Sequence, residues 1–309
     1  MILSIKDNWD QARSHHQVYV RDRVERHASD LATAGGAKAR VAAFLNAIGD
    51  DIGTAPFHEL TNTIPVFNTY LEQCKTEEER VAFRGTLREV FDYDSFAAKT
   101  TPGWNAYGLC KLSRTRTCPY CNQAYAFTVV HADSGKGFRP TLDHFLPKHV
   151  FPHLALSLSN LIPSCYTCNS NLKGRLDFYK HPHLHPLYDD ESIKFELKVP
   201  GVDHIELVSN FEAMKHRAVL GVTWDNESEK ATNSARTFLI AERYDSHQAD
   251  AVDFASLHIL FDKNRIADIR KIGINISQEQ ILRFDRAKYR EVLLGKMYAD
   301  VFDLFARDN

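Results

Sequence analysis

The feature that most constrains this chain is a pair of short cysteine motifs with identical spacing, Cys118-Pro-Tyr-Cys121 and Cys165-Tyr-Thr-Cys168. A tight C-x-x-C turn delivers two thiolates at once, and tetrahedral zinc needs four of them at about 2.3 Å. The doubled spacing therefore predicts one structural zinc per chain, held by Cys118, Cys121, Cys165 and Cys168. Two separate redox pairs, or a chance arrangement, are the alternatives.

The other two cysteines, Cys74 and Cys110, stand alone and are expected to be small buried apolar side chains rather than ligands. The first residues, Met1–Asp7, have neither a long apolar core nor a small-residue cleavage site, so we expect no signal peptide. No apolar run approaches the roughly 20 residues that a bilayer requires. These observations predict a protein of a reducing, cytoplasmic compartment without membrane contact.

Helical patterns dominate both ends of the chain of 309 residues, which is long enough for one large domain or two ordinary ones. Capping boxes are expected at Thr76–Glu79 and at Ser277–Gln280. Apolar residues then recur at helical spacing, at 83, 87, 90 and 91 and again at 294, 297, 301, 304 and 305. The predicted fold is α+β and mostly helical, with helical regions at 1–103 and, after a β-hairpin, within 191–309.

Two β-hairpins are expected between these helical regions. The first would pair the β-prone residues 124–131 with 138–144 across a turn at Asp133–Gly137. The second would pair 195–199 with 205–208 across Pro200-Gly201, because apolar and polar residues alternate on both sides.

The interval between the cysteine pairs is 43 residues, far longer than a simple zinc ribbon holds. It contains Leu142-Asp-His-Phe-Leu-Pro-Lys148 and Ser159-Asn-Leu-Ile-Pro-Ser-Cys165. After the last cysteine comes Asn169-Ser-Asn-Leu-Lys-Gly174.

In this order, these motifs resemble the HNH endonuclease family, the zinc-stapled branch of the ββα-metal (His-Me finger) nucleases. The resemblance covers about residues 115 to 180 and implies a central ββα-metal module, with domain limits that we place at 104–190. It implies a metal-dependent hydrolase of phosphodiester bonds, acting on DNA rather than RNA.

The resemblance also implies a role for each matching residue. His144 would be the general base, since an imidazole titrates near neutral pH. Asp143 and Asn169 would bind a catalytic Mg²⁺ or Mn²⁺, and Asn160 would hold the loop that orients His144. Three residues rather than two separate Asn169 from Lys173, so Asn171 remains an alternative ligand. Neighbours on a strand point to opposite sides, so only the implied geometry, with a bend, brings Asp143 and His144 to one phosphate.

Contacts to nucleic acid are expected from Lys148 and Lys173, and from Arg114 and Arg116 before the first cysteine pair. A solvated basic loop is the alternative for the two arginines. Residues 104–180 hold nine Lys or Arg and three Asp, a formal charge of +6, whereas the whole chain carries −2. The remainder is therefore acidic, at −8. Local positive charge can attract phosphate, while the acidic flanks should weaken nonspecific binding.

A further, weaker similarity is to HNH nucleases of bacterial antiphage systems such as Septu, which work with an ATPase partner. It rests on the Asp-His-Phe-x-Pro-Lys motif and on an HNH core within a helical chain. It implies a protein partner for the helical flanks. Two alternatives remain: a zinc-stapled module that binds nucleic acid or protein without cutting, and a nuclease toxin directed at RNA.

Overall fold

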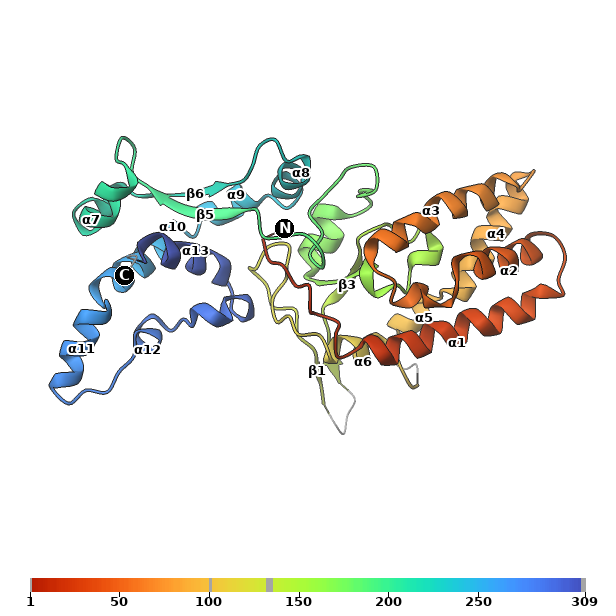
Figure 1. Ribbon diagram of the computed structural model, residues 1–309, viewed down its shortest axis with the longest axis horizontal. Helices are drawn as coiled ribbons and strands as arrows, with labels where there is room; N and C mark the ends of the chain where they lie inside the picture. Colours follow the sequence, from red (N-terminus) through yellow and green to blue (C-terminus); the bar gives the residue numbers. More distant parts are fainter. Residues whose placement is uncertain (1, 100–101, 132–135, 307–309) are drawn as a thin grey trace. The chain divides into compact units, whose positions relative to one another are not determined.

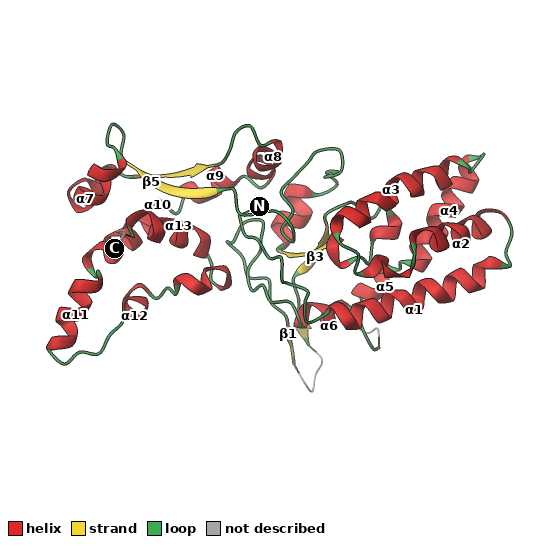
Figure 2. Ribbon diagram, in the orientation of Figure 1, coloured by secondary structure: helices red, strands yellow, loops and turns green. Residues whose placement is uncertain are grey.

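The computed structural model describes residues 2–99, 102–131 and 136–306 (Figure 1). Helices dominate these residues, and the strands form three small antiparallel sheets of two strands each (Figure 2). The mostly helical α+β fold is therefore confirmed. In the described part of the chain, no helix is both long enough and apolar enough to cross a membrane.

The chain divides into two compact units. The N-terminal unit comprises Ile5–Thr115 and Ala126–His181. The C-terminal unit comprises Met1–Ser4, Arg116–Tyr125 and Pro182–Asn309. The domain limits inferred from the sequence, 1–103, 104–190 and 191–309, remain a prediction.

The helices of the N-terminal unit pack around a cluster of phenylalanine rings. They are α1 (Arg13–Ala32), α2 (Gly36–Ile48), α3 (Phe57–Glu72), α4 (Glu77–Val90), α5 (Tyr93–Ala97), α6 (Ala106–Lys111) and the short turn η1 (Asp50–Gly53). Phe44, Phe67 and Phe83 are fully buried, and their ring centroids lie 6.0 Å apart in each pair. Edge-to-face and tilted packing of such rings adds to the burial of their area.

Thr76 caps the start of helix α4, as predicted: its hydroxyl accepts a hydrogen bond from the Glu79 amide, 3.2 Å away. The Glu79 carboxylate, however, accepts from the amide of Lys75 at 2.8 Å rather than from that of Thr76. The predicted N-cap is confirmed. The second hydrogen bond of the capping box joins Glu79 to the amide of Lys75, one residue before Thr76.

The strand that carries Asp143 and His144 has a different partner from the expected one. Strand β3 (Thr141–His144) pairs with β4 (Leu161–Ser164), whereas only β1 (Val129–Val130) and β2 (Gly137–Phe138) form the predicted first hairpin. The turn residues Asp133, Ser134 and Gly135 lie outside the described residues. Burial explains the choice, because β3 and β4 are almost wholly covered while β1 and β2 are exposed on both faces.

In the C-terminal unit, β5 (Lys194–Lys198) pairs with β6 (Val219–Thr223). The predicted second hairpin is wrong, because residues 205–208 lie in helix α7 (His204–Met214). The Asp203 carboxylate accepts from the Glu206 amide at 2.8 Å and starts the helix. Leu207 and Phe211, four residues apart, are buried, while Ile205 is 77% exposed. The short alternation of apolar residues was thus one face of a helix.

The remaining helices close this unit: α8 (Glu229–Thr237), α9 (Ile240–Asp245), α10 (Gln248–Leu260), α11 (Lys263–Lys271), α12 (Gln278–Leu282) and α13 (Gly295–Phe305). The capping box of Ser277 and Gln280 is confirmed in full at the start of α12. Helix α13 buries Met297, Val301 and Phe305, as the helical spacing predicts.

Besides His144 of the Asp-His motif, His16 and His153 are buried in the N-terminal unit in neutral form. His16 Nε2 donates to the Leu156 carbonyl at 2.6 Å, and its Nδ1 accepts from the Trp104 indole at 3.0 Å. His153 stacks on Phe67, with ring centroids 4.8 Å apart. Burial disfavours the imidazolium and lowers the pKa of His16 to about 4 and that of His153 to about 3.

We expect these histidines to make folding sensitive to mild acid. Below pH 6.5 the unfolded chain takes up protons that the folded chain excludes, so the free energy of unfolding falls as the pH falls. Each histidine removes about 2 kcal/mol between pH 7 and pH 5. Chemical denaturation at both pH values should show that His153→Phe loses about 2 kcal/mol less than wild type. Equal losses in the two proteins would contradict this assignment.

Candidate functional site

The four cysteines of the two C-x-x-C motifs form one cluster. The sulfur atoms of Cys118, Cys121, Cys165 and Cys168 all lie within 4.8 Å of one another. Among the described residues, this is the group of three or more His, Cys, Asp or Glu side chains placed to hold a metal ion. Four thiolates at this separation suit tetrahedral zinc, so the donor set fits the predicted structural ion.

Each motif is shaped as a turn by its own backbone. In the first, the Asn122 amide donates to the Cys118 carbonyl at 2.7 Å, and the Gln123 amide contacts Cys121 Sγ at 3.5 Å. In the second, the Cys168 amide contacts Cys165 Sγ at 3.4 Å. Amide donors beside sulfur favour the thiolate form that a metal requires.

Cys74 and Cys110 lie outside the cluster and are buried, as predicted. Burial raises the pKa of the Cys110 thiol to about 12. It is therefore protonated at neutral pH and has the character of an apolar core residue.

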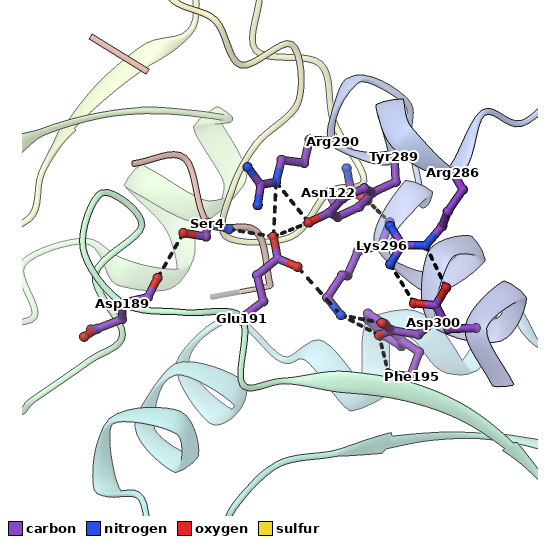
Figure 3. Close-up of polar contacts among 11 residues, drawn as sticks. Ser4, Asn122, Asp189, Glu191, Phe195, Arg286, Tyr289, Arg290, Lys296 and Asp300 are labelled. Atoms are coloured by element: carbon purple, nitrogen blue, oxygen red, sulfur yellow. Dashed lines mark hydrogen bonds and ion pairs between the residues drawn. The ribbon is translucent and has the colours of Figure 1, made fainter. Parts of the chain in front are cut away.

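The loop after Cys121 is anchored by Asn122, which has a left-handed backbone with a φ of 51° (Figure 3). Its side-chain amide donates to Thr117 Oγ1 at 2.8 Å and to the Val292 carbonyl at 3.0 Å. Its side-chain oxygen accepts from the Lys296 amide at 2.9 Å. Asn tolerates this conformation better than most residues, and these bonds fix the loop against the start of α13.

The same helix carries a buried ionic network (Figure 3). Lys296 Nζ lies 2.5 Å and 2.7 Å from the two carboxylate oxygens of Asp300. Glu191 accepts hydrogen bonds from the Tyr289 hydroxyl at 2.8 Å and from the Ser4 amide at 2.9 Å. The bond from Ser4 attaches the start of the chain to the rest of the C-terminal unit. No sequence motif predicted this network.

The Asp-His pair lies at the end of β3, where Asp143 is paired with Ile162 and His144 with Leu161. The two side chains contact different elements. Asp143 accepts from Lys173 Nζ at 2.6 Å, whereas His144 Nε2 lies 3.0 Å from the Ala155 carbonyl. The strand thus presents the carboxylate and the imidazole to separate partners, as its alternation requires.

His144 has a defined tautomer. A carbonyl oxygen can only accept, so Nε2 carries the hydrogen and the neutral ring keeps its lone pair on Nδ1. The Tyr93 ring packs edge-on against the imidazole, with centroids 4.4 Å apart. Burial lowers the pKa of His144 to about 3, so the ring is neutral at neutral pH and a weaker base than a free imidazole. The expectation that this imidazole titrates near neutral pH is therefore wrong.

Asn160 is fully buried and braces the loop that follows His144. Its side-chain amide donates to the carbonyls of Leu146 and Leu154, each at 3.0 Å, and its oxygen accepts from the Leu146 amide at 2.6 Å. Leu154 immediately precedes Ala155, whose carbonyl holds the imidazole. The position of Ala155 therefore depends on Asn160.

We expect Asn160→Ala to lower the free energy of unfolding by about 3 kcal/mol, because three buried backbone groups lose their partner. The exposed Asn171 offers a matched control, and Asn171→Ala should change stability by less than about 0.5 kcal/mol. Urea denaturation followed by circular dichroism measures both. A loss below about 1 kcal/mol for Asn160→Ala would show that the loop holds itself without this side chain.

A helical turn, η4 (Thr167–Lys173), begins within the second cysteine motif and packs against β3. It contains a wide turn, because the Gly174 amide donates to the Asn169 carbonyl at 2.9 Å, five residues back. Asn169 is half-buried in the first part of this turn, whereas Asn171 is exposed. The choice between Asn169 and Asn171 as the metal ligand remains a prediction.

The cations expected to contact nucleic acid are partly engaged within the chain. Lys148 Nζ lies 2.8 Å from Asp94 and 4.6 Å from the centre of the Tyr93 ring. Arg114 lies 2.8 Å from Asp7, and Arg116 is exposed. Exposed pairs of this kind contribute little to stability and can exchange for a phosphate.

Lys173 differs from the other three cations. It is buried against Asp143 and donates to the His144 carbonyl as well. In this conformation its ammonium does not reach the surface.

A pocket of about 230 Å³ lies beside the groups that hold His144. Its lining includes Tyr93 and Ala155, which contact the imidazole, together with Arg88, Asp94 and Lys148. Tyr93 and Ala155 were not identified from the sequence, since neither belongs to a motif and Ala155 acts through its backbone.

Short parts of the chain are similar in sequence to two known proteins. Septu protein PtuB of Bacillus thuringiensis is 43% identical over 51 residues, which are 16% of this chain and 20% of that protein. Protein ea31 of Escherichia phage lambda is 30% identical over 99 residues, which are 31% of this chain and 29% of that protein. The chain is therefore a partial homologue of a Septu protein, and it spans less than a third of either relative.

No family model matches the chain. No solved structure matches it either.

Proposed function

We propose that this protein is a metal-dependent endonuclease of the HNH type, which hydrolyses phosphodiester bonds in DNA in preference to RNA. The carrying observation is the arrangement around His144. The ring is held at Nε2 by the Ala155 carbonyl, so Nδ1 is the atom with a lone pair. A neutral imidazole that is fixed at Nε2 and carries its lone pair on Nδ1 can accept a proton from water, and its lowered pKa makes it a weaker base than a free imidazole.

The proposal places the catalytic divalent ion at Asp143. The Asp143 carboxylate holds a cation in the structure, the ammonium of Lys173, and Asn169 lies in the turn η4, which packs against β3. Carboxylate and amide oxygens are hard donors that suit Mg²⁺ or Mn²⁺. When bound by Asp143 and Asn169, such an ion supplies charge neutralisation at the phosphate and at the leaving oxygen.

In the proposed reaction, His144 Nδ1 accepts a proton from the attacking water. The Ala155 carbonyl then stabilises the imidazolium through Nε2–H. Asn160 is a positioning residue, because it holds the loop that presents this carbonyl. Arg88 and Lys148 line the adjacent pocket and would attract the phosphate backbone.

We further propose that the protein acts in antiphage defence. This rests on the partial similarity to the Septu protein, and on the resemblance of its central motifs to HNH nucleases. An ATPase or another protein partner would bind the helical flanks. Zinc at the four cysteines would hold the module in shape without taking part in the reaction.

The test is a cleavage assay with the purified chain, His144→Gln and an exposed control, His58→Ala. Supercoiled plasmid and RNA are incubated with each protein in Mg²⁺ or Mn²⁺, and again with EDTA. Metal-dependent nicking by wild type and by His58→Ala, absent in His144→Gln, supports the proposal.

Faster cleavage of RNA than of plasmid would reassign the substrate. Equal inactivity of wild type and His144→Gln, both on these substrates and in phage plaque assays in cells carrying the native locus, would favour a non-catalytic binding module.

A further inference from the structure

Lys173 is a charged side chain in the protein interior, where charged groups are rare. Its side chain and that of Asp143 are each 3% exposed, and Nζ lies 2.6 Å from Asp143 Oδ1. The same ammonium donates to the His144 carbonyl and sits 4.8 Å from the centre of the Phe178 ring. Three partners of suitable sign offset the cost of removing this ammonium from water.

The Lys173 ammonium lies at the carboxylate to which the proposed function assigns the catalytic metal ion. Asp143 is the carboxylate that the proposed endonuclease would use to bind its divalent ion. A metal ion bound to the same carboxylate would lie close to Nζ, and the two positive charges would repel each other strongly at such low exposure. Asp143 cannot hold both cations in the arrangement that the structure shows.

We propose that Lys173 is an internal counter-ion that occupies the cation position at Asp143 and competes with the catalytic divalent ion. This inference rests on the proposed function and adds a control to it. The ammonium keeps the buried Asp143 neutralised without metal, so the strand and the turn η4 stay packed. Metal binding then requires Lys173 to withdraw from Oδ1, which sets the metal affinity below what the oxygen ligands alone would give.

The test measures Mn²⁺ binding by isothermal titration calorimetry on the full, zinc-loaded chain. Lys173→Met keeps the apolar stem and removes the competing charge. We expect its Kd for Mn²⁺ to fall at least about tenfold relative to wild type. Its melting temperature should be lower than that of wild type without Mn²⁺ and should recover at saturating Mn²⁺.

Two controls accompany the variant. Lys38→Met removes an exposed cation of the same unit, and its Mn²⁺ affinity should equal that of wild type. Asp143→Asn should abolish the binding in question. A structure of the wild-type chain with Mn²⁺ gives a second readout that needs no variant to fold. In it, Nζ should lie beyond about 3.5 Å from Oδ1.

Unchanged or weaker Mn²⁺ binding by Lys173→Met, or a Nζ–Oδ1 distance that stays near 2.6 Å with Mn²⁺ on Asp143, would overturn the competition. The proposed nuclease would survive that result if wild type still cleaves plasmid in an Asp143-dependent way. Absence of Asp143-dependent Mn²⁺ binding in every protein would instead remove the metal site on which both proposals depend.

Discussion

Cys118→Ser and Cys165→Ser are each expected to release zinc and to abolish cooperative melting. The four sulfur atoms lie within 4.8 Å of one another, so one ion can bind all of them and close a structural site. Structural zinc contributes folding free energy directly, on the order of 10 kcal/mol or more in small zinc modules. A serine hydroxyl is a far poorer ligand than a thiolate, so one substitution in either motif should forfeit most of that energy.

Elemental analysis of the purified proteins measures the zinc, and thermal unfolding followed by circular dichroism measures the stability. Wild type should contain one zinc per chain, and both variants should contain almost none. Cys74→Ser is the matched control: Cys74 is buried outside the cluster, and its sulfur contacts the Tyr70 carbonyl, which a serine hydroxyl can also approach. Its zinc content should stay at one. Zinc-free wild type, or full zinc in either variant, would refute the site.

His144→Ala is expected to reduce the cleavage rate by about 10²- to 10⁴-fold, which is the usual contribution of a positioned general base. The variant loses Nδ1 while Asp143 and the cysteine cluster remain. His144→Gln retains a polar side chain of similar length without a basic nitrogen and should be equally slow. A rate loss shared by both variants therefore reports the missing base rather than a cavity.

Stability must be separated from catalysis in this experiment, because His144 is buried against Tyr93. Zinc content and melting temperature are measured for each variant, and the assay is run well below the lowest melting temperature. His58→Ala, on the exposed part of α3, should cleave at the wild-type rate. Wild-type rates in both His144 variants would exclude His144 as the base and direct attention to another residue.

Local patterns predicted several parts of the fold correctly. The caps at Thr76 and Ser277, the buried stripe of α13 and the burial of Cys74 each follow from contacts within a few residues or from the chemistry of one side chain. Such signals are complete within a short stretch of chain. The resemblance to HNH nucleases also rests on short motifs, and it remains a prediction.

Strand pairing could not be predicted in this way. Residues 205–208 alternate as a strand would, yet the Asp203 cap and the burial of Phe211 make them part of a helix. Strand β3, which carries Asp143, pairs with β4, and both strands are almost wholly buried. Which strand covers another depends on segments distant in sequence, and so no short pattern contains that information.

The sequence by itself determined the grouping of four cysteines, the mostly helical composition and the identity of the Asp-His pair. Only the tertiary structure decided what surrounds that pair: the Ala155 carbonyl and Tyr93 ring at His144, and the buried ammonium of Lys173 at Asp143. The reason is that a motif specifies which chemical groups are present. Their protonation, orientation and charge partners depend on which groups the folded chain places within a few ångströms.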